Sequence, residues 1–521
     1  MNQLIFARKT SGLVKGLSWF DAFLLVISAP AGSGILYYSV STASEYPGAN
    51  VALSFLIGMF VILPVIFLAA ISSNVIPKSG SLYVFISRIV SPGIGFVTAS
   101  LFFLGYTLSI GVVAFVVTQV VGGILVNAGM AGGASAVQQF GELLQNPYWS
   151  AVGGTCLVLL TWAIVLRGIR VFRNVMRVLF AVTVVSAGIT VVCFLLVSHE
   201  GVVQQFNSNW GENAYQRVMA LATEKGWTAP AFSLPSTLNL LLVVLFSYAG
   251  LELISYASGE ISQAERKAMR AYIWAGVCLG AIYIAIAFSA TRAFGEFVGA
   301  YDFLVKNHAE ALKEVMPAIS PSIPFYVASI MPNPWLGVAI SLGLSLWLVT
   351  TMIPYFFSPS RLIFALAMDR AIPESMADVN PRTGAPTKAS HLTLFFALVG
   401  VFFNLMNVGT VLGTILFSAV FVYWLYGLSA MLLPYKNPEL FARVPLQASL
   451  LGVPLLSVVG AITFGIGWFV IFIAARQMSM DVVIALCVYM TLTMLFYVVR
   501  LQKNRERGID SYQVYAQLPP D

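Results

Sequence analysis

The feature that most constrains this chain is a series of long apolar stretches, repeated along nearly its whole length. Hydrophobic residues make up 59% of the 521 residues and charged residues only 9%, whereas a soluble domain carries about 25% charged residues. Each stretch runs for about 18–28 residues, enough to cross the roughly 30 Å hydrocarbon layer of a bilayer as a helix. A water-soluble fold is therefore excluded, and the pattern predicts an all-α polytopic membrane protein.

We distinguish about twelve transmembrane helices, an even number that places both ends of the chain on one side of the membrane. The first stretch is far too long for a cleaved signal peptide, so we expect it to remain as a span. All four cysteines fall within apolar stretches, and no disulfide framework is expected. The predicted spans are Leu17–Thr42, Ala49–Val75, Ile94–Asn127, Trp149–Leu166, Val175–Ser198, Thr237–Ser258, Ala271–Thr291, Trp335–Leu362, Ala389–Asn407, Thr410–Leu433, Leu450–Ala474 and Val482–Val499.

The basic residues between the spans predict the orientation. With the N-terminus in the cytoplasm, 22 of the 28 lysines and arginines fall inside and 6 outside, as the positive-inside rule requires. We therefore expect a multi-pass protein of the plasma membrane with cytoplasmic tails over residues 1–16 and 500–521. The chain has no soluble basic domain that would suit a nucleic acid, so no nucleic-acid partner is expected.

Other features lie between the spans. Four arginines from Arg167 to Arg177 separate the fourth and fifth spans; they are a topology signal or, alternatively, a site for anionic lipid headgroups. Two outside loops are long, Ser198–Pro235 and Arg292–Pro334. The second contains an amphipathic run, Tyr301–Val315, which would lie across the outer mouth of a pathway or simply along the surface.

Two spans have an irregular middle. The first contains Ser28–Ile35, where Pro30 and two glycines predict an unwound stretch. The sixth contains Phe246–Glu252, whose carboxyl lies at a depth where charge costs roughly 2.5–3.5 kcal/mol or more. Each of these spans opens a set of five helices, which points to two inverted repeats with a site between them near the midplane. The predicted divisions are repeats over 17–198 and 237–433, an extracellular loop over 199–236, and two extra helices within 450–499.

The polarity of the broken helices indicates what such a site would bind. The second half of the first span restarts near Gly34, and its free N–H groups and positive dipole end would suit a carboxylate. The first half of the sixth span ends near Phe246–Ala249, and its free carbonyls and negative end would suit an ammonium group. Together the two ends predict a receptor for a small zwitterion.

Several segments resemble the amino acid–polyamine–organocation (APC) superfamily of permeases, over roughly residues 12 to 430. The resemblance implies a ten-helix core of two inverted repeats plus two further helices, and secondary transport of amino acids, by symport or antiport, through alternating access. The segments that carry it are Trp19–Phe23, Gly32–Ile35, Pro77–Tyr83, Phe246–Glu252 and Ser360–Pro373, the last followed by Asn380, Gly384 and Pro386.

The resemblance also implies a substrate site made largely of main-chain groups. Phe246 would add an aromatic lid, unless its ring is only packed against its neighbours. The chain departs from many relatives at Ala249, where they carry a glycine, and at Gly259-Glu260, where they carry paired acids. The implied carboxylate donors are the amides of Ser33, Gly34 and Ile35, and the implied acceptors for the amino group are the carbonyls of Pro30, Phe246, Ser247 and Ala249.

No cofactor or metal centre is expected, but transport of this kind uses a coupling ion, H⁺ or Na⁺. Some proton-coupled members carry a lysine in the fifth helix, and the matching stretch Arg177–Ala181 has none. Glu252 is then the best candidate for proton coupling, unless it only bonds to freed backbone or to a neighbouring polar group. Ser358 and Ser360 would offer hydroxyls to sodium, or they cap backbone groups freed by nearby prolines.

Three alternatives stay open from the sequence. A membrane enzyme is disfavoured because the chain lacks HExxH, CxxC, Walker and GxSxG motifs. A channel is disfavoured because no charged ring or filter-like run is present. A transporter of polyamines or other organic cations is the main alternative, since Glu252 would attract a second positive charge.

Asp21 is expected to be structural, because Ser18 and Asp21 have capping-box spacing.

Overall fold

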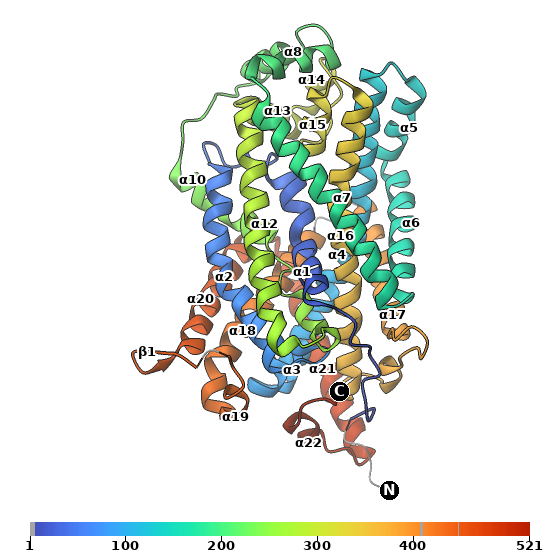
Figure 1. Cartoon of the computed structure of the whole chain (residues 1–521), viewed down its shortest axis with the longest axis vertical. Coiled ribbons are helices and arrows are strands. Elements are labelled where there is room, and N and C mark those ends of the chain that lie inside the picture. The colour runs from blue at the N-terminus through green and yellow to red at the C-terminus, as the bar shows by residue number, and fades with distance from the viewer. Residues whose placement is uncertain (1–5, 407–409, 446, 521) are drawn as a thin grey trace.

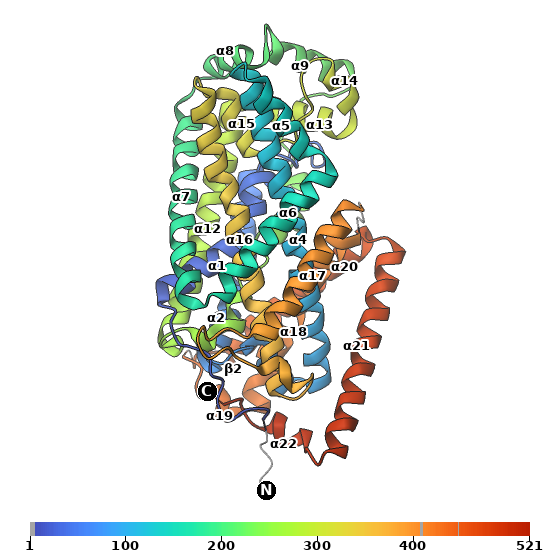
Figure 2. The same ribbon diagram turned by 90° about the vertical axis from the view of Figure 1, so that its right-hand side faces the viewer.

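The computed structural model describes residues 6–406, 410–445 and 447–520, without the side chains of residues 33, 265–266, 410–420 and 473–477. Long helices lie side by side in one bundle (Figures 1 and 2). Short helices cover one end of the bundle, and both termini lie at the opposite end. We refer to these as the outer end and the inner end.

Nine of the helices in the described part of the chain are long and apolar enough to cross a membrane. They are α2 (Val51–Val75), α4 (Pro92–Ala131), α6 (Pro147–Leu166), α7 (Ile169–Leu196), α12 (Ala264–Phe294), α16 (Pro334–Met368), α17 (Thr387–Leu405), α20 (Leu455–Gln477) and α21 (Met480–Glu506).

The predicted first and sixth spans are shorter apolar helices because each is interrupted. The first is α1 (Trp19–Ser33) followed by a π-helical turn, Gly34–Tyr38. The sixth span consists of α10 (Leu234–Asn239), α11 (Leu241–Ser247) and a 3₁₀ helix, Leu253–Glu260.

The predicted tenth span corresponds to α18 (Thr410–Lys436). The side chains of residues 410–420 in this helix lie outside the described part of the chain, and so does Asn407, at the end of the predicted ninth span.

Several helices extend past the boundaries that the apolar pattern predicts. The helix α4 has 40 residues and α16 has 35, so at about 1.5 Å per residue both exceed the hydrocarbon thickness and project beyond it.

The span predicted to begin at Leu450 was placed too early. A hairpin of β1 (Ser449–Leu450) and β2 (Val453–Pro454) precedes α20 there, because Leu451 and Gly452 take positive φ angles in the turn.

The remaining short helices lie between the long ones. The segments predicted as long outside loops fold into helices at the outer end, and the run Tyr301–Val315 divides between two of them at His308 (Figure 1). The outer helices are α5 (Ser135–Gln145), α8 (His199–Trp210), α9 (Ala214–Glu224), α13 (Phe297–Asn307), α14 (Ala309–Lys313) and α15 (Ile323–Ile330); the others are α3 (Ser81–Ile89), a 3₁₀ turn at Glu374–Ala377, α19 (Pro438–Phe441) and α22 (Ser511–Ala516).

Glycines allow the closest helix contact in the core. A Cβ atom on Gly111 of α4 would lie 2.2 Å from the carbonyl oxygen of Ala397, and one on Gly400 of α17 would lie 2.2 Å from that of Leu108. The two backbones therefore touch directly, the close approach that small residues permit between membrane helices. This contact fixes α4, which forms one wall of the central cavity described below.

Candidate functional site

The break in the first span is a widened turn. Within α1, Thr351 of α16 repairs the backbone around Pro30: its hydroxyl donates to the Ser28 carbonyl (2.9 Å) and accepts from the Gly32 amide (3.3 Å). The Thr351 hydroxyl thus bridges an i,i+4 pair of main-chain groups beside Pro30, and the chain stays helical through Ser33 before it widens into the π-helical turn. The prediction of an unwound stretch over Ser28–Ile35 was therefore wrong.

The amides expected to be free are buried in this turn. The Gly34 amide donates to the Ala31 carbonyl, so it is paired. Ile35 is fully buried, and the side chain of Ser33 lies outside the described part. Gly34 has no room for a side chain, because a Cβ atom there would lie 2.5 Å from the ring of Tyr283.

The sixth span is interrupted where the sequence predicts it. Helix α11 ends at Ser247, the chain turns through Tyr248–Glu252, and the 3₁₀ helix follows. Gly250 carries the turn with φ +110°, a conformation that glycine adopts without steric cost. Ala249 is buried, and its amide donates to the Phe246 carbonyl at 3.0 Å.

Tyr283 of α12 joins the two breaks. Its hydroxyl lies 2.7 Å from the Ser247 carbonyl oxygen and 3.0 Å from that of Pro30, within hydrogen-bond distance of both. These are two of the carbonyls that the family resemblance implies as acceptors for a substrate amino group. The phenol therefore occupies the place expected for the ammonium. Tyr283 is one of 21 tyrosines and lies in an otherwise ordinary apolar span, so the sequence held no signal for it.

Glu252 is fully buried beside the sixth-span break. Its carboxylate accepts hydrogen bonds from Tyr106 of α4 (2.6 Å), Tyr423 of α18 (2.9 Å) and the Gly250 amide (3.1 Å). The sequence singled out this carboxyl but neither of the tyrosines that hold it. Three donors on two oxygens stabilise a buried carboxylate.

The two serines of α16 differ in their partners. The Ser360 hydroxyl donates to the Phe357 carbonyl at 2.7 Å and accepts from Arg361 at 3.0 Å. The Ser358 hydroxyl is buried and makes no hydrogen bond within the described part of the chain.

A cavity of about 620 Å³ lies next to the breaks and extends toward the outer end. At its deep end it is lined by Phe246, Thr351 and Tyr355, and toward the outer end by Gln145 and Ser320. The ring of Phe246 meets that of Tyr38 edge-on, with centroids 6.0 Å apart. Phe246 lines this cavity, whereas Ser247 and Pro30 do not.

The inner end is tied by arginine ion pairs. Glu260, at the end of the 3₁₀ helix, accepts from Arg361 at 2.7 and 3.3 Å, and Arg88 binds both carboxylate oxygens of Asp369. Asp21 and Ser18 form the predicted capping box, which confirms the structural role of Asp21.

The N-terminal end of α1 has further ties at the inner end. Asp21 binds Arg177 of α7 at 2.8 Å. Leu17 exchanges main-chain hydrogen bonds with the end of the sixth span, donating to Glu260 (3.0 Å) and accepting from Ser262 (2.8 Å). The inner half of α1 is thus tied to both α7 and the sixth span.

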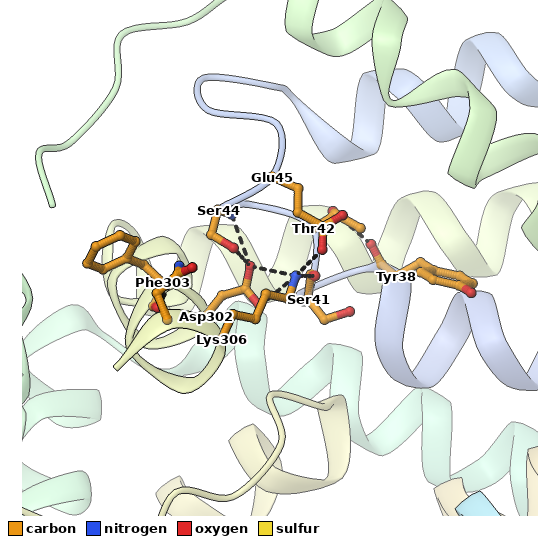
Figure 3. A network of polar contacts seen from close by, with 9 residues as sticks. Tyr38, Ser41, Thr42, Ser44, Glu45, Asp302, Phe303 and Lys306 are labelled. Atoms are coloured by element: carbon orange, nitrogen blue, oxygen red, sulfur yellow. Dashed lines mark hydrogen bonds and ion pairs between the residues drawn. The ribbon is translucent and has the colours of Figure 1, made fainter. Parts of the chain in front are cut away.

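A polar network at the outer end is shown in Figure 3. Asp302 of α13 accepts from the Ser44 amide (2.9 Å) and hydroxyl (2.5 Å). Lys306, one turn further along α13, binds Asp302 (3.2 Å), Glu45 (2.9 Å) and the carbonyl of Ser41. The short helix α13 is thereby connected to the segment that follows the π-helical turn.

Comparison with known proteins identifies the kind of protein that carries this site. The family described as amino acid permease matches residues 17–496. The chain belongs to this family. The permease is therefore a membrane transporter of amino acids or related compounds, not an enzyme, and the resemblance drawn from its motifs is confirmed.

Curated relatives are similar in sequence to the permease over most of its length. A methylthioribose transporter of Bacillus subtilis (strain 168) is 23% identical over 442 residues, covering 84% of this chain and 85% of the relative. A gamma-aminobutyric acid permease of the same organism is 24% identical, covering 82% of each chain. A vacuolar cationic amino acid transporter of Arabidopsis thaliana is 23% identical, covering 81% of this chain and 60% of the relative.

Proposed function

We propose that the permease is a secondary active transporter of amino acids that works by alternating access and binds its zwitterionic substrate between the breaks in the first and sixth spans. The observation that carries this proposal is the pair of carbonyls of Pro30, within α1, and Ser247, at the end of α11, which converge on the one hydroxyl of Tyr283. A substrate ammonium has three donors and would replace the hydroxyl of Tyr283 at both.

The carboxylate of the substrate would bind the amides of Ser33, Gly34 and Ile35. The Gly34 amide would exchange its partner, the Ala31 carbonyl, for the substrate. An amide reaches a carboxylate only where no side chain intervenes, which is why glycine suits this position. Movement of the Tyr283 ring away from Gly34 would vacate this space together with the ammonium position.

The carbonyls of Phe246 and Ala249 complete the proposed ammonium site. The ring of Phe246 would act as the lid, because it lines the cavity while its own main chain belongs to the site. Closure of this ring over the charged groups of a bound substrate would shield them from the outer end of the cavity, a step that alternating access requires.

The scaffold for this mechanism would be twelve spans, with residues 17–198 and 237–433 as inverted repeats and two further helices within 450–499. Interruptions in the helices that open each repeat support this arrangement. We place the tails over 1–16 and 500–521 in the cytoplasm and the loop over 199–236 outside the cell, in a plasma membrane, on the charge asymmetry of the loops.

Glu252 is our candidate for proton coupling, and Ser358 and Ser360 are candidates for contact with Na⁺. If Glu252 exchanges a proton during transport, Glu252→Gln flattens the pH dependence of uptake while substrate binding persists. Uptake into liposomes, with and without an imposed proton gradient, measures this. Gradient-driven accumulation equal to that of the unmodified protein contradicts a coupling role.

The names of the relatives include a sugar derivative as well as amino acids, so substrate class needs direct measurement. Purified permease in liposomes should take up labelled amino acids with saturation and competition by unlabelled ones. Ohmic current without saturation would indicate a channel, and competition by putrescine but by no amino acid would indicate a transporter of organic cations.

A further inference from the structure

The lining of the central cavity is uncharged. It comprises 22 residues of the described chain, and none is aspartate, glutamate, lysine, arginine or histidine. Its polar members, such as Gln119 and Gln145, are neutral amides and hydroxyls. A charged side chain entering this space would therefore meet no ion of opposite sign.

One wall of the cavity is made of valine. Val112, Val113, Val116 and Val120 of α4 all line it, at a spacing that places them on one face of the helix. Leu348 of α16 adds to this apolar surface, and α16 packs directly against α4. The close contact between α4 and α17 holds the wall in place.

The buried carboxyl of the sixth span does not reach the cavity. Glu252 is held by the hydroxyls of Tyr106 and Tyr423 and has no exposed surface. The ring of Tyr106 packs edge-on against that of Tyr355, with centroids 5.0 Å apart, and Tyr355 is the residue that lines the cavity. Aromatic rings thus lie between this carboxylate and any substrate side chain.

From these observations we infer that the permease selects amino acids with a neutral, apolar side chain. The inference rests on the proposed function and specifies its substrate class. A lysine, arginine or glutamate side chain would lose its hydration in the cavity without gaining a charged partner, which is costly. An aliphatic side chain would instead bury its surface against the valine wall.

The test is a binding panel with the purified full-length permease. Leucine, methionine and phenylalanine are compared with lysine, arginine, glutamate and putrescine by thermal shift and by competition for labelled leucine uptake into liposomes. We expect the neutral amino acids to compete at least about 100-fold better than the charged compounds. If lysine or glutamate competes as well as leucine, the inference is overturned while amino-acid transport stands. If no amino acid binds, the proposed function itself fails.

A substitution in the wall locates the selectivity. Val116→Asp adds a carboxylate, and we expect lysine to compete at least about 10-fold better against it than against the matched control Val116→Asn. Both variants should weaken leucine binding, because each makes the wall polar. Equal competition by lysine in the two variants would show that the valine wall does not face the substrate side chain. Should Val116→Asp fail to fold, the panel on the unmodified protein decides the inference alone.

Discussion

The two ends of the permease are held together in different ways. At the inner end, the side chains of Arg361 and Glu260 are 2% and 1% exposed, and those of Arg88 and Asp369 are 4% and 0% exposed. At the outer end, the side chain of Lys306 is 30% exposed, and those of its partners Asp302 and Glu45 are 0% and 56% exposed. Two ion pairs at the inner end thus have guanidinium groups shielded from water, whereas the Asp302 network at the outer end has a partly hydrated ammonium.

This difference predicts which end moves more easily. Removing one member of a buried ion pair costs about 3–5 kcal/mol, because the other charge is left without a partner. An exposed pair contributes about 0–1 kcal/mol. The outer network therefore resists separation less, in keeping with a cavity that extends toward that end and away from the arginine pairs. A closed inner end and an accessible outer end are what binding from outside requires.

The largest effect is expected from breaking the buried pair at the inner end. Arg361→Met leaves the Glu260 carboxylate buried and unpaired, and we expect it to lower the free energy of unfolding by about 3–5 kcal/mol. Apparent melting temperature of the purified protein measures the loss. The double variant with Glu260→Gln removes both charges and should recover much of the stability. A single variant as stable as the unmodified protein would show that the inner pair does not hold that end.

A smaller effect is expected between the two ends, at Tyr283. Tyr283→Phe removes the hydroxyl that contacts both carbonyls but keeps the ring contacts with Phe55 and Tyr248. Because a hydrogen bond contributes about 1 kcal/mol, we expect leucine to bind about fivefold more tightly to the variant. The substrate-free variant should also melt earlier. Binding that weakens instead would indicate that the hydroxyl contacts the substrate rather than competing with it.

The smallest effect is expected at the outer end. Lys306→Ala removes the partly exposed ammonium, while Asp302 keeps its two hydrogen bonds from Ser44, and we therefore expect the free energy of unfolding to change by about 1 kcal/mol. Melting temperature, measured beside that of Arg361→Met, makes the comparison direct. A loss as large as in the arginine variant would remove the proposed difference between the ends.

Sequence alone predicts the long helices, because each is an apolar stretch of the required length. It also predicts the interruption of the sixth span, the burial of Glu252 and the capping box at Ser18. These features depend on residue types close together in the chain. Proline, glycine and an isolated carboxyl in an apolar run have local consequences that need no knowledge of the neighbouring helices.

The contacts that complete the site lie beyond such reasoning. The hydroxyl of Tyr283 reaches carbonyls that are 36 and 253 positions away in the chain, and the Thr351 hydroxyl reaches one that is 323 positions away. A tyrosine or threonine in an apolar span has no local feature that distinguishes these roles from ordinary packing. The prediction for the first span around Pro30 was wrong for the same reason, since the hydroxyl that bridges Ser28 and Gly32 comes from another helix.

The central claim is that the two broken spans bind opposite ends of a zwitterion. It is tested most directly by competition for labelled leucine uptake with two compounds that each lack one charge, leucine methyl ester and 4-methylpentanoate. Neither compound can satisfy both the amides near Gly34 and the carbonyls of Pro30 and Ser247. We therefore predict that each competes at least about 100-fold more weakly than leucine. Competition by either compound equal to that of leucine would contradict a site that needs both charges.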